Sequence, residues 1–166
     1  MSSNGTDAAK GNILVVDDSP ENLHLITQIL AERGYRVQTT TSGSRALVAL
    51  RSTHPDLILL DVKMPGMDGY ELCRHLKGND GTSDIPIVFI SVLGKTEDKV
   101  KGFGAGGADY ITKPFQIDEV IARVETQLAL RDTQKQLLDT NRELESRLQE
   151  LARSKEAEAC NLHKLR

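Results

Sequence analysis

Residues 13–22 read ILVVDDSPEN, and they predict a strand, a turn and the start of a helix in direct succession. Four apolar residues in a row, 13–16, are typical of a strand that is buried on both faces of a sheet. Ser19 followed by Pro20 is typical of a helix start, because serine caps free backbone N–H groups and proline suits the first helical position. The helix that follows carries apolar residues at helical spacing, at Leu23, Ile26, Ile29 and Leu30. A buried strand that leads through an acidic turn into an amphipathic helix is half of a parallel βαβ unit.

The same alternation of strand and helix recurs four more times along the chain. Short apolar runs predict further strands at residues 35–39, 57–60, 87–90 and 110–111. Helix starts are marked at Ser42, Asp68, Thr96 and Ile117. For the helix that begins near Thr96, we expect Val100 and Phe103 to form the inner face. The sequence therefore predicts an α/β fold, a doubly wound parallel sheet with helices on both faces.

The composition indicates which classes of ligand and which cellular compartment to expect. The chain carries 21 Lys and Arg against 24 Asp and Glu, a formal charge of −3. This balance argues against nucleic acid as the main ligand, because phosphate binding needs clustered basic residues. No apolar run approaches the roughly 20 residues that span a bilayer, and residues 1–10 contain no apolar segment typical of a signal peptide. Cys73 and Cys160 are too few for a disulfide framework. We therefore expect a cytoplasmic protein that binds neither nucleic acid nor membranes.

A break in composition divides the chain. All 13 glycines lie at or before Gly107 and the last of the five prolines is Pro114, whereas the sequence after residue 130 is dense in Leu, Glu, Arg, Gln and Lys. Glycine and proline mark turns, and the other five residue types favour helices. We expect a disordered N-terminus over residues 1–10, a compact domain over residues 11–128 and a helical extension over residues 129–166.

Five residues with carboxylate, hydroxyl or ammonium side chains lie directly after predicted strands or close behind them. Asp17 and Asp18 follow the first strand, Asp61 the third, Ser91 the fourth and Lys113 the fifth. The carboxyl ends of parallel strands lie at one edge of a sheet, so these side chains are expected to meet there. Three carboxylates in a small volume repel one another unless a cation lies among them, and a hard divalent ion such as Mg²⁺ suits their oxygens. With Lys113 to bind an incoming anion, this set suits phosphoryl transfer onto a carboxylate.

Four stretches of the sequence together form a specific combination of motifs. They are ILVVDDSPEN (13–22), PDLILLDVKMPGMDGYEL (55–72), IPIVFIS (85–91) and AGGADYITKPF (105–115). Through these motifs, residues 11–125 resemble the receiver domain of the two-component response-regulator family. The resemblance implies a flavodoxin-like (βα)₅ fold, Mg²⁺ as cofactor and a histidine kinase as the partner that supplies the phosphoryl group.

The resemblance assigns four residues to the acceptor and the metal, by their position in these motifs. Asp61 resembles the phospho-acceptor. Asp18 resembles a direct ligand of the metal ion, and Asp17 resembles a residue that acts on the metal through water. The backbone carbonyl of Lys63 would be a further ligand.

The resemblance also implies a switch and a phosphate-binding residue. Ser91 and Tyr110 resemble the switch pair, and Lys113 resembles the lysine that binds the phosphoryl group. The next residue, Pro114, is often cis in the family. Val92 departs from the pattern, because a small residue, commonly alanine, usually follows the switch hydroxyl. A branched side chain there could restrict access to the phosphoryl group and so change the rates of phosphorylation and dephosphorylation.

Two other classes of α/β protein fit the sequence less well. A haloacid-dehalogenase-like phosphatase also uses an aspartate after a strand, but it needs a second aspartate two residues later as general acid and base, where this chain has Lys63. A dinucleotide-binding fold would have a glycine-rich fingerprint after the first strand, where residues 17–20 read DDSP. We therefore expect a signalling switch and not an enzyme.

The C-terminal extension repeats leucine every seven residues. The d positions of this heptad grid are Leu130, Leu137, Leu144, Leu151 and Leu165, with Glu158 as the exception. The a positions are Gln134, Asn141, Leu148, Lys155 and Leu162. Leucine at d predicts a coiled coil, and asparagine at one a position favours a parallel pair in register. We expect a parallel homodimer through residues 130–165.

The expected role of the extension follows from where its helix begins, which is directly after the last predicted strand. A movement at that strand is expected to pass along the helix to an output domain or a downstream protein. A stand-alone dimeric phosphorelay intermediate is the alternative function. A solvated helical spacer that pairs with nothing is the alternative role of the extension.

Overall fold

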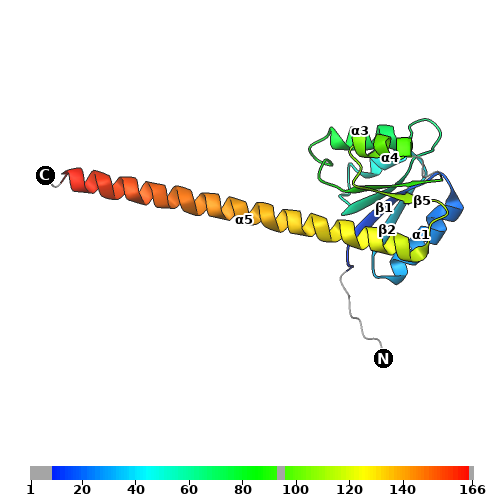
Figure 1. Ribbon diagram of the computed structural model, residues 1–166, viewed down its shortest axis with the longest axis horizontal. Coiled ribbons are helices and arrows are strands. Elements are labelled where there is room, and N and C mark those ends of the chain that lie inside the picture. The colour runs from blue at the N-terminus through cyan, green and yellow to red at the C-terminus, as the bar shows by residue number, and fades with distance from the viewer. Residues whose placement is uncertain (1–8, 93–95, 165–166) are drawn as a thin grey trace, which may run out of the picture. The chain divides into compact units, whose positions relative to one another are not determined.

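The computed structural model describes residues 9–92 and 96–164 (Figure 1). Most of the N-terminus that we predict to be disordered, residues 1–8, lies outside the described residues, and so does Leu165 of the heptad grid. Strands and helices alternate in the order β1 (Asn12–Val16), α1 (Pro20–Glu32), β2 (Arg36–Thr40), α2 (Gly43–Ala49), β3 (Leu57–Asp61), α3 (Gly69–Lys77), β4 (Ile87–Ser91), α4 (Thr96–Gly104), β5 (Asp109–Thr112) and α5 (Ile117–Lys164). The chain divides into two compact units, and the boundary falls after Leu128.

The five strands form one parallel sheet in the order β2-β1-β3-β4-β5. Strand β1 pairs with β2 on one side and with β3 on the other, so the direction in which the chain winds reverses at β1. In open α/β sheets, ligands bind at the carboxyl ends of the strands beside such a reversal. The predicted doubly wound α/β fold is confirmed, and its topology directs attention to the ends of β1 and β3.

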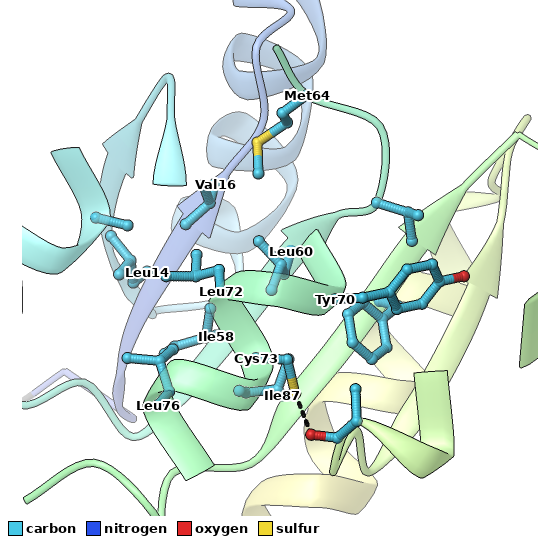
Figure 2. Close-up of a cluster of buried hydrophobic side chains, with 14 of the residues drawn as sticks. Leu14, Val16, Ile58, Leu60, Met64, Tyr70, Leu72, Cys73, Leu76 and Ile87 are labelled. Carbon is cyan, nitrogen blue, oxygen red and sulfur yellow. Dashed lines mark hydrogen bonds between the residues drawn. The ribbon is translucent and has the colours of Figure 1, made fainter. Parts of the chain in front are cut away.

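Side chains of the central strands alternate between two apolar clusters, one on each face of the sheet. On β1, Leu14 and Val16 belong to the first cluster, whereas Ile13 and Val15 belong to the second. The first cluster contains residues of α2 and of α3, and Figure 2 labels those of α3. The second cluster contains residues of α1 and α5. In Figure 1, α3 and α4 accordingly lie across the sheet from α1. Burial of both faces explains why the central strands read as unbroken apolar runs.

The prediction for the inner face of α4 is wrong. Val100 is 65% exposed and Phe103 is 53% exposed, so neither side chain belongs to the core. The helix meets the sheet at Gly102 instead, where a Cβ atom would lie 3.1 Å from Cδ2 of Phe89. Because the ring of Phe89 on β4 already fills the space beneath the helix, a glycine faces the core and the larger side chains remain at the surface.

The long C-terminal helix is confirmed, since α5 extends from Ile117 to Lys164. In its first turns, Val120 and Val124 are fully buried in the second apolar cluster. Beyond residue 128 its large apolar side chains are exposed, namely Leu130, Leu137, Leu138, Leu144, Leu148, Leu151 and Leu162. Of the helices that the structure describes, none has a stretch long and apolar enough to cross a membrane.

Gly69 begins α3 in close contact with the end of β3. Its N–H donates to the carbonyl of Val62 at 2.9 Å, and a Cβ atom on it would collide with the carbonyl oxygen of Asp61. We expect Gly69→Ala to lower the free energy of unfolding by about 2–3 kcal/mol, because no side-chain rotation can relieve a collision with backbone. Urea denaturation followed by circular dichroism measures this loss.

Gly104→Ala is the matched control for this prediction. A Cβ atom at Gly104 would meet nothing within 4 Å, and alanine favours the helical conformation over glycine. This variant is expected to be as stable as the parent, or more stable by up to about 1 kcal/mol. Equal losses in the two variants would contradict the assignment of the Gly69 effect to its close contact with β3.

Candidate functional site

The carboxyl edge of the sheet brings three aspartates together. Val16 of β1 pairs with Leu60 of β3, so the next residues along these strands, Asp17 and Asp61, are neighbours. One carboxylate oxygen of each, together with one of Asp18, forms a group in which all three atoms lie within 4.8 Å of one another. Asp17 and Asp61 are buried, whereas Asp18 is exposed. The cluster thus has two carboxylates embedded in the domain and one at its surface.

Lys113 contacts this cluster from the loop that follows β5. Its Nζ lies 3.1 Å from Oδ2 of Asp17 and 3.5 Å from Oδ1 of Asp61. Its backbone N–H donates to the carbonyl of Ser91, the last residue of β4, so Ser91 lies at the same edge. The peptide bond from Lys113 to Pro114 is cis. The ammonium group of Lys113 neutralises part of the negative charge of the two buried carboxylates.

Asp17 is held by three hydrogen-bond donors and is only 1% exposed. Its Oδ1 accepts the backbone N–H of Ser19 at 2.9 Å. Its Oδ2 accepts from Nδ2 of Asn22 at 3.3 Å and from Nζ of Lys113 at 3.1 Å. Donors on both oxygens fix the orientation of a carboxylate, so Asp17 presents a defined face to the other two aspartates.

Sequence reasoning did not identify Ser19 and Asn22 as residues of the site. The sequence pattern predicts Ser19 only as a helix cap. The structure confirms this role, since its Oγ accepts the N–H of Asn22 at 3.4 Å, and adds the contact with Asp17. The first turn of α1 folds back toward Asp17, and this fold places both donors on its carboxylate. The signal in the sequence is weak, because it consists only of two polar residues, two and five positions after Asp17.

Asp61 shows the effect of crowding negative charge in a buried site. Burial raises its pKa most, the charges of Asp17 and Asp18 raise it further, and Lys113 lowers it. Together these effects raise the pKa of Asp61 to about 7. The folded chain therefore disfavours the anionic form of this side chain, which is expected where a site lacks enough positive charge.

The raised pKa of Asp61 predicts how Asp61→Asn changes stability when divalent metal is chelated. The folded chain holds the Asp61 proton up to about pH 7, whereas the unfolded chain releases it near pH 4. Ionisation of Asp61 thus destabilises the fold. The loss of stability begins at about pH 4, grows as the pH rises and reaches its full size above about pH 7. We expect Asp61→Asn to add about 1–3 kcal/mol of stability at pH 8 and little near pH 4. Thermal denaturation in chelator at the two pH values measures this difference, and equal gains at both would contradict it.

The donor set fits one hard divalent cation. Three carboxylates offer oxygen ligands within reach of a single ion, and burial together with the charges of Asp17 and Asp18 raises the pKa of Asp61. Lys63 lies two residues after Asp61, and its side chain is exposed. Such oxygen ligands are those that Mg²⁺ prefers in proteins.

Ser91 and Tyr110, the expected switch pair, lie on the neighbouring strands β4 and β5. Tyr110 pairs with Phe89 in the sheet, and the centroids of their rings are 6.3 Å apart. The ring of Tyr110 is buried, and its hydroxyl has no hydrogen-bond partner among the described residues. Tyr110 therefore already points inward, away from the surface. Val92, directly after Ser91, is 58% exposed.

Comparisons with known proteins give one consistent result. Residues 13–125 match the family described as the response regulator receiver domain. The chain is 38% identical over 120 residues to the DNA-binding dual master transcriptional regulator RpaA of Synechocystis sp., and 40% identical over 122 residues to the DNA-binding response regulator MtrA of Mycolicibacterium smegmatis. These alignments cover 72% and 74% of this chain but 50% and 52% of those proteins, so the chain spans about half the length of these curated relatives.

A similar solved structure is the signal receiver domain of a signal transduction histidine kinase from Syntrophus aciditrophicus. It is 39% identical in sequence and superposes with a TM-score of 0.68, covering 72% of this chain and 90% of that one. Sequence match and sheet topology thus agree on the predicted flavodoxin-like fold. The chain belongs to the response regulator receiver domain family of two-component systems.

Proposed function

We propose that this chain is a phosphorylation-dependent signalling switch that accepts a phosphoryl group on Asp61. The observation that carries the proposal is the position of this buried carboxylate, grouped with those of Asp17 and Asp18 and 3.5 Å from the ammonium group of Lys113. An anionic oxygen beside a cation and at a potential metal site is the arrangement that phosphoryl transfer to a carboxylate needs.

The proposed step is an in-line displacement at phosphorus. A carboxylate oxygen of Asp61 forms the new O–P bond, while the bond from phosphorus to a nitrogen of the donor histidine breaks and that nitrogen keeps the electron pair. Lys113 binds an oxygen of the transferred group and neutralises part of its charge. The hydroxyl of Ser91 donates a hydrogen bond to another oxygen of the same group. Positioning and charge neutralisation supply most of the rate in such transfers.

The residues proposed to hold Mg²⁺ are Asp17, Asp18, Asp61 and the backbone carbonyl of Lys63. What Mg²⁺ supplies when bound there is neutralisation of the charge that the transferred group brings to three carboxylates. Lys63 also occupies the position at which a phosphatase of the haloacid-dehalogenase type needs its general acid and base. We therefore propose that the chain accepts and holds the phosphoryl group, without the turnover of an enzyme.

The proposed relay leads from Ser91 through Tyr110 to α5. The backbone N–H of Tyr110 donates to Oδ1 of Asp109 at 2.8 Å, and Nη1 of Arg123 lies 3.2 and 3.1 Å from the two oxygens of the same carboxylate. Asp109 thus connects the strand that carries the switch tyrosine to the helix that leaves the domain. A shift of Ser91 toward the phosphoryl group, followed by a shift of Tyr110, would reach α5 through this contact.

The proposed partners are a histidine kinase, an output domain or protein, and a second copy of the chain through residues 130–165. RpaA and MtrA are named as DNA-binding, and this chain aligns with about half of each. For this chain, the near-balanced charge favours protein partners over nucleic acid.

The proposed function is tested by incubation with phosphoramidate, a small donor that needs no kinase. We expect the intact mass to increase by one phosphoryl group in the presence of Mg²⁺ and to stay unchanged when the metal is chelated. Long incubations are needed, because Val92 is expected to slow the reaction. Full uptake in chelator would refute the proposed role of the carboxylate cluster in metal binding.

A further inference from the structure

The Oδ2 atom of Asp17 receives two donors of different kinds. One is the charged Nζ of Lys113 at 3.1 Å, and the other is the neutral Nδ2 of Asn22 at 3.3 Å. The other oxygen, Oδ1, receives only the backbone N–H of Ser19 among the hydrogen bonds of the described residues. Since Asp17 is 1% exposed, these donors replace the water that would otherwise solvate its charge.

The two donors on Oδ2 are not equally available in every state of the site. Lys113 is shared, because its Nζ also lies 3.5 Å from Oδ1 of Asp61. A phosphoryl group on Asp61 brings additional negative charge to that side, which attracts the ammonium group away from Asp17. Among the described residues, the amide of Asn22 has no competing partner of this kind, so it is the side-chain donor that stays on Oδ2 when Lys113 moves.

The location of Asn22 suits a fixed donor. It lies in the first turn of α1, and its backbone N–H donates to Oγ of Ser19 at 3.4 Å, so helix capping and the contact with Asp17 are made by one residue. A neutral amide binds a carboxylate without adding positive charge that would compete with a cation. A carboxylate in its place would add a fourth negative charge to the cluster.

We propose that Asn22 is a positioning residue, which fixes the carboxylate of Asp17 in the orientation that divalent metal binding requires. The inference rests on the proposed function, because it concerns the same cation site. It assigns to Asn22 an effect on metal affinity, exerted through Asp17, and no contact with the transferred group. Partners that orient a metal ligand from behind typically change affinity by about 10–100-fold when removed.

The test is the affinity for Mn²⁺, measured by electron paramagnetic resonance without any phosphoryl donor. Asn22→Ala removes the donor, and Asn22→Leu removes it while keeping a side chain that branches at the same carbon atom. His24→Ala, at an exposed position of the same helix, is the matched control. We expect both Asn22 variants to bind Mn²⁺ about tenfold more weakly than the parent, and His24→Ala to bind it as the parent does.

A second readout separates positioning from a general loss of structure. With phosphoramidate, the Asn22 variants should need about tenfold more Mg²⁺ for half-maximal uptake but reach the rate of the parent at saturation. Unchanged metal affinity in both variants would overturn the inference, and so would an equal loss in His24→Ala. A lowered saturating rate with unchanged affinity would overturn it as well. If the parent chain binds no Mn²⁺, the proposed metal site fails and the role of Asn22 fails with it.

Discussion

Asp61→Asn is expected to abolish phosphoryl uptake, with a rate at least about 100-fold below that of the parent chain. The amide has nearly the shape of the carboxylate but carries no negative charge, so it is a poor nucleophile toward phosphorus. The substitution also removes a buried charge and its repulsion by Asp17, the two largest causes of the raised pKa of Asp61, and it should therefore stabilise the fold at neutral and higher pH. Because a stabilised variant remains folded, the loss of uptake can be assigned to chemistry.

The measurement is the intact mass after incubation with phosphoramidate and Mg²⁺, taken at several times and compared with the parent. Asp80→Asn is the matched control, since Asp80 is an exposed carboxylate in the loop between α3 and β4. This control is expected to take up one phosphoryl group as the parent does. Uptake by Asp61→Asn at the rate of the control would show that another residue is the acceptor.

The edge of the sheet at which the acidic residues lie could be predicted, because the end of each strand can be recognised from its own sequence. An apolar run shows where a strand ends, and parallel strands end at one edge, so Asp17 and Asp61 were expected at the same edge of the sheet. The structure adds the register, in which Val16 pairs with Leu60 and places the two aspartates side by side. It also adds the degree of burial, which no sequence pattern shows and which is the largest cause of the raised pKa of Asp61.

The errors and omissions have physical causes as well. Val100 and Phe103 have the spacing of a buried helical face, but the space beneath α4 is filled by a ring from another strand, Phe89. The donor from Asn22 depends on how the turn after β1 directs the first turn of α1. Both features are set by contacts between elements, whereas sequence periodicity reports only on a single element.

The inward position of Tyr110 bears on how the proposed switch would work. Its hydroxyl is buried with no hydrogen-bond partner in the described part of the chain, and a buried hydroxyl without a partner lowers stability. A rearrangement that gives this hydroxyl a hydrogen-bond partner or returns it to water would remove that loss of stability. The packing of its ring at 6.3 Å from Phe89 acts in the opposite direction. The unsatisfied hydroxyl favours an outward position of Tyr110 and the ring packing favours the inward one, which is compatible with two positions of similar free energy.

The full chain is expected to be a dimer at tens of micromolar, whereas a chain that ends at Leu128 is expected to be a monomer. The reason is the row of exposed leucines on α5 beyond the first unit, which a pair of helices would bury. Polar residues at core positions, among them Asn141 and Lys155, keep the pair weak. Sedimentation equilibrium of both chains measures the difference. If both sediment as monomers, the extension is a spacer; if both are dimers, the interface lies in the first unit.

Substitutions along α5 test whether the heptad grid is the reason for pairing. Leu144→Lys combined with Leu151→Lys places four charges in the expected interface of a dimer and should weaken it at least about 100-fold. Ser146→Lys combined with Gln149→Lys is the matched control, because it adds the same number of charges at two positions on the outer side of the grid. Equal weakening by the two pairs of substitutions would contradict the grid.

The proposed relay to an output depends on the orientation of the expected pair. In a parallel pair in register, each residue at a d position faces the same residue of its partner. Glu158→Cys, in a chain whose exposed Cys160 is replaced by serine, should therefore form an intermolecular disulfide rapidly on mild oxidation. An antiparallel pair would place position 158 far from its counterpart, and no such disulfide would form. Because a parallel pair sends both helices out of the receiver domains in the same direction, only this arrangement would deliver the movement of two switches to one shared output.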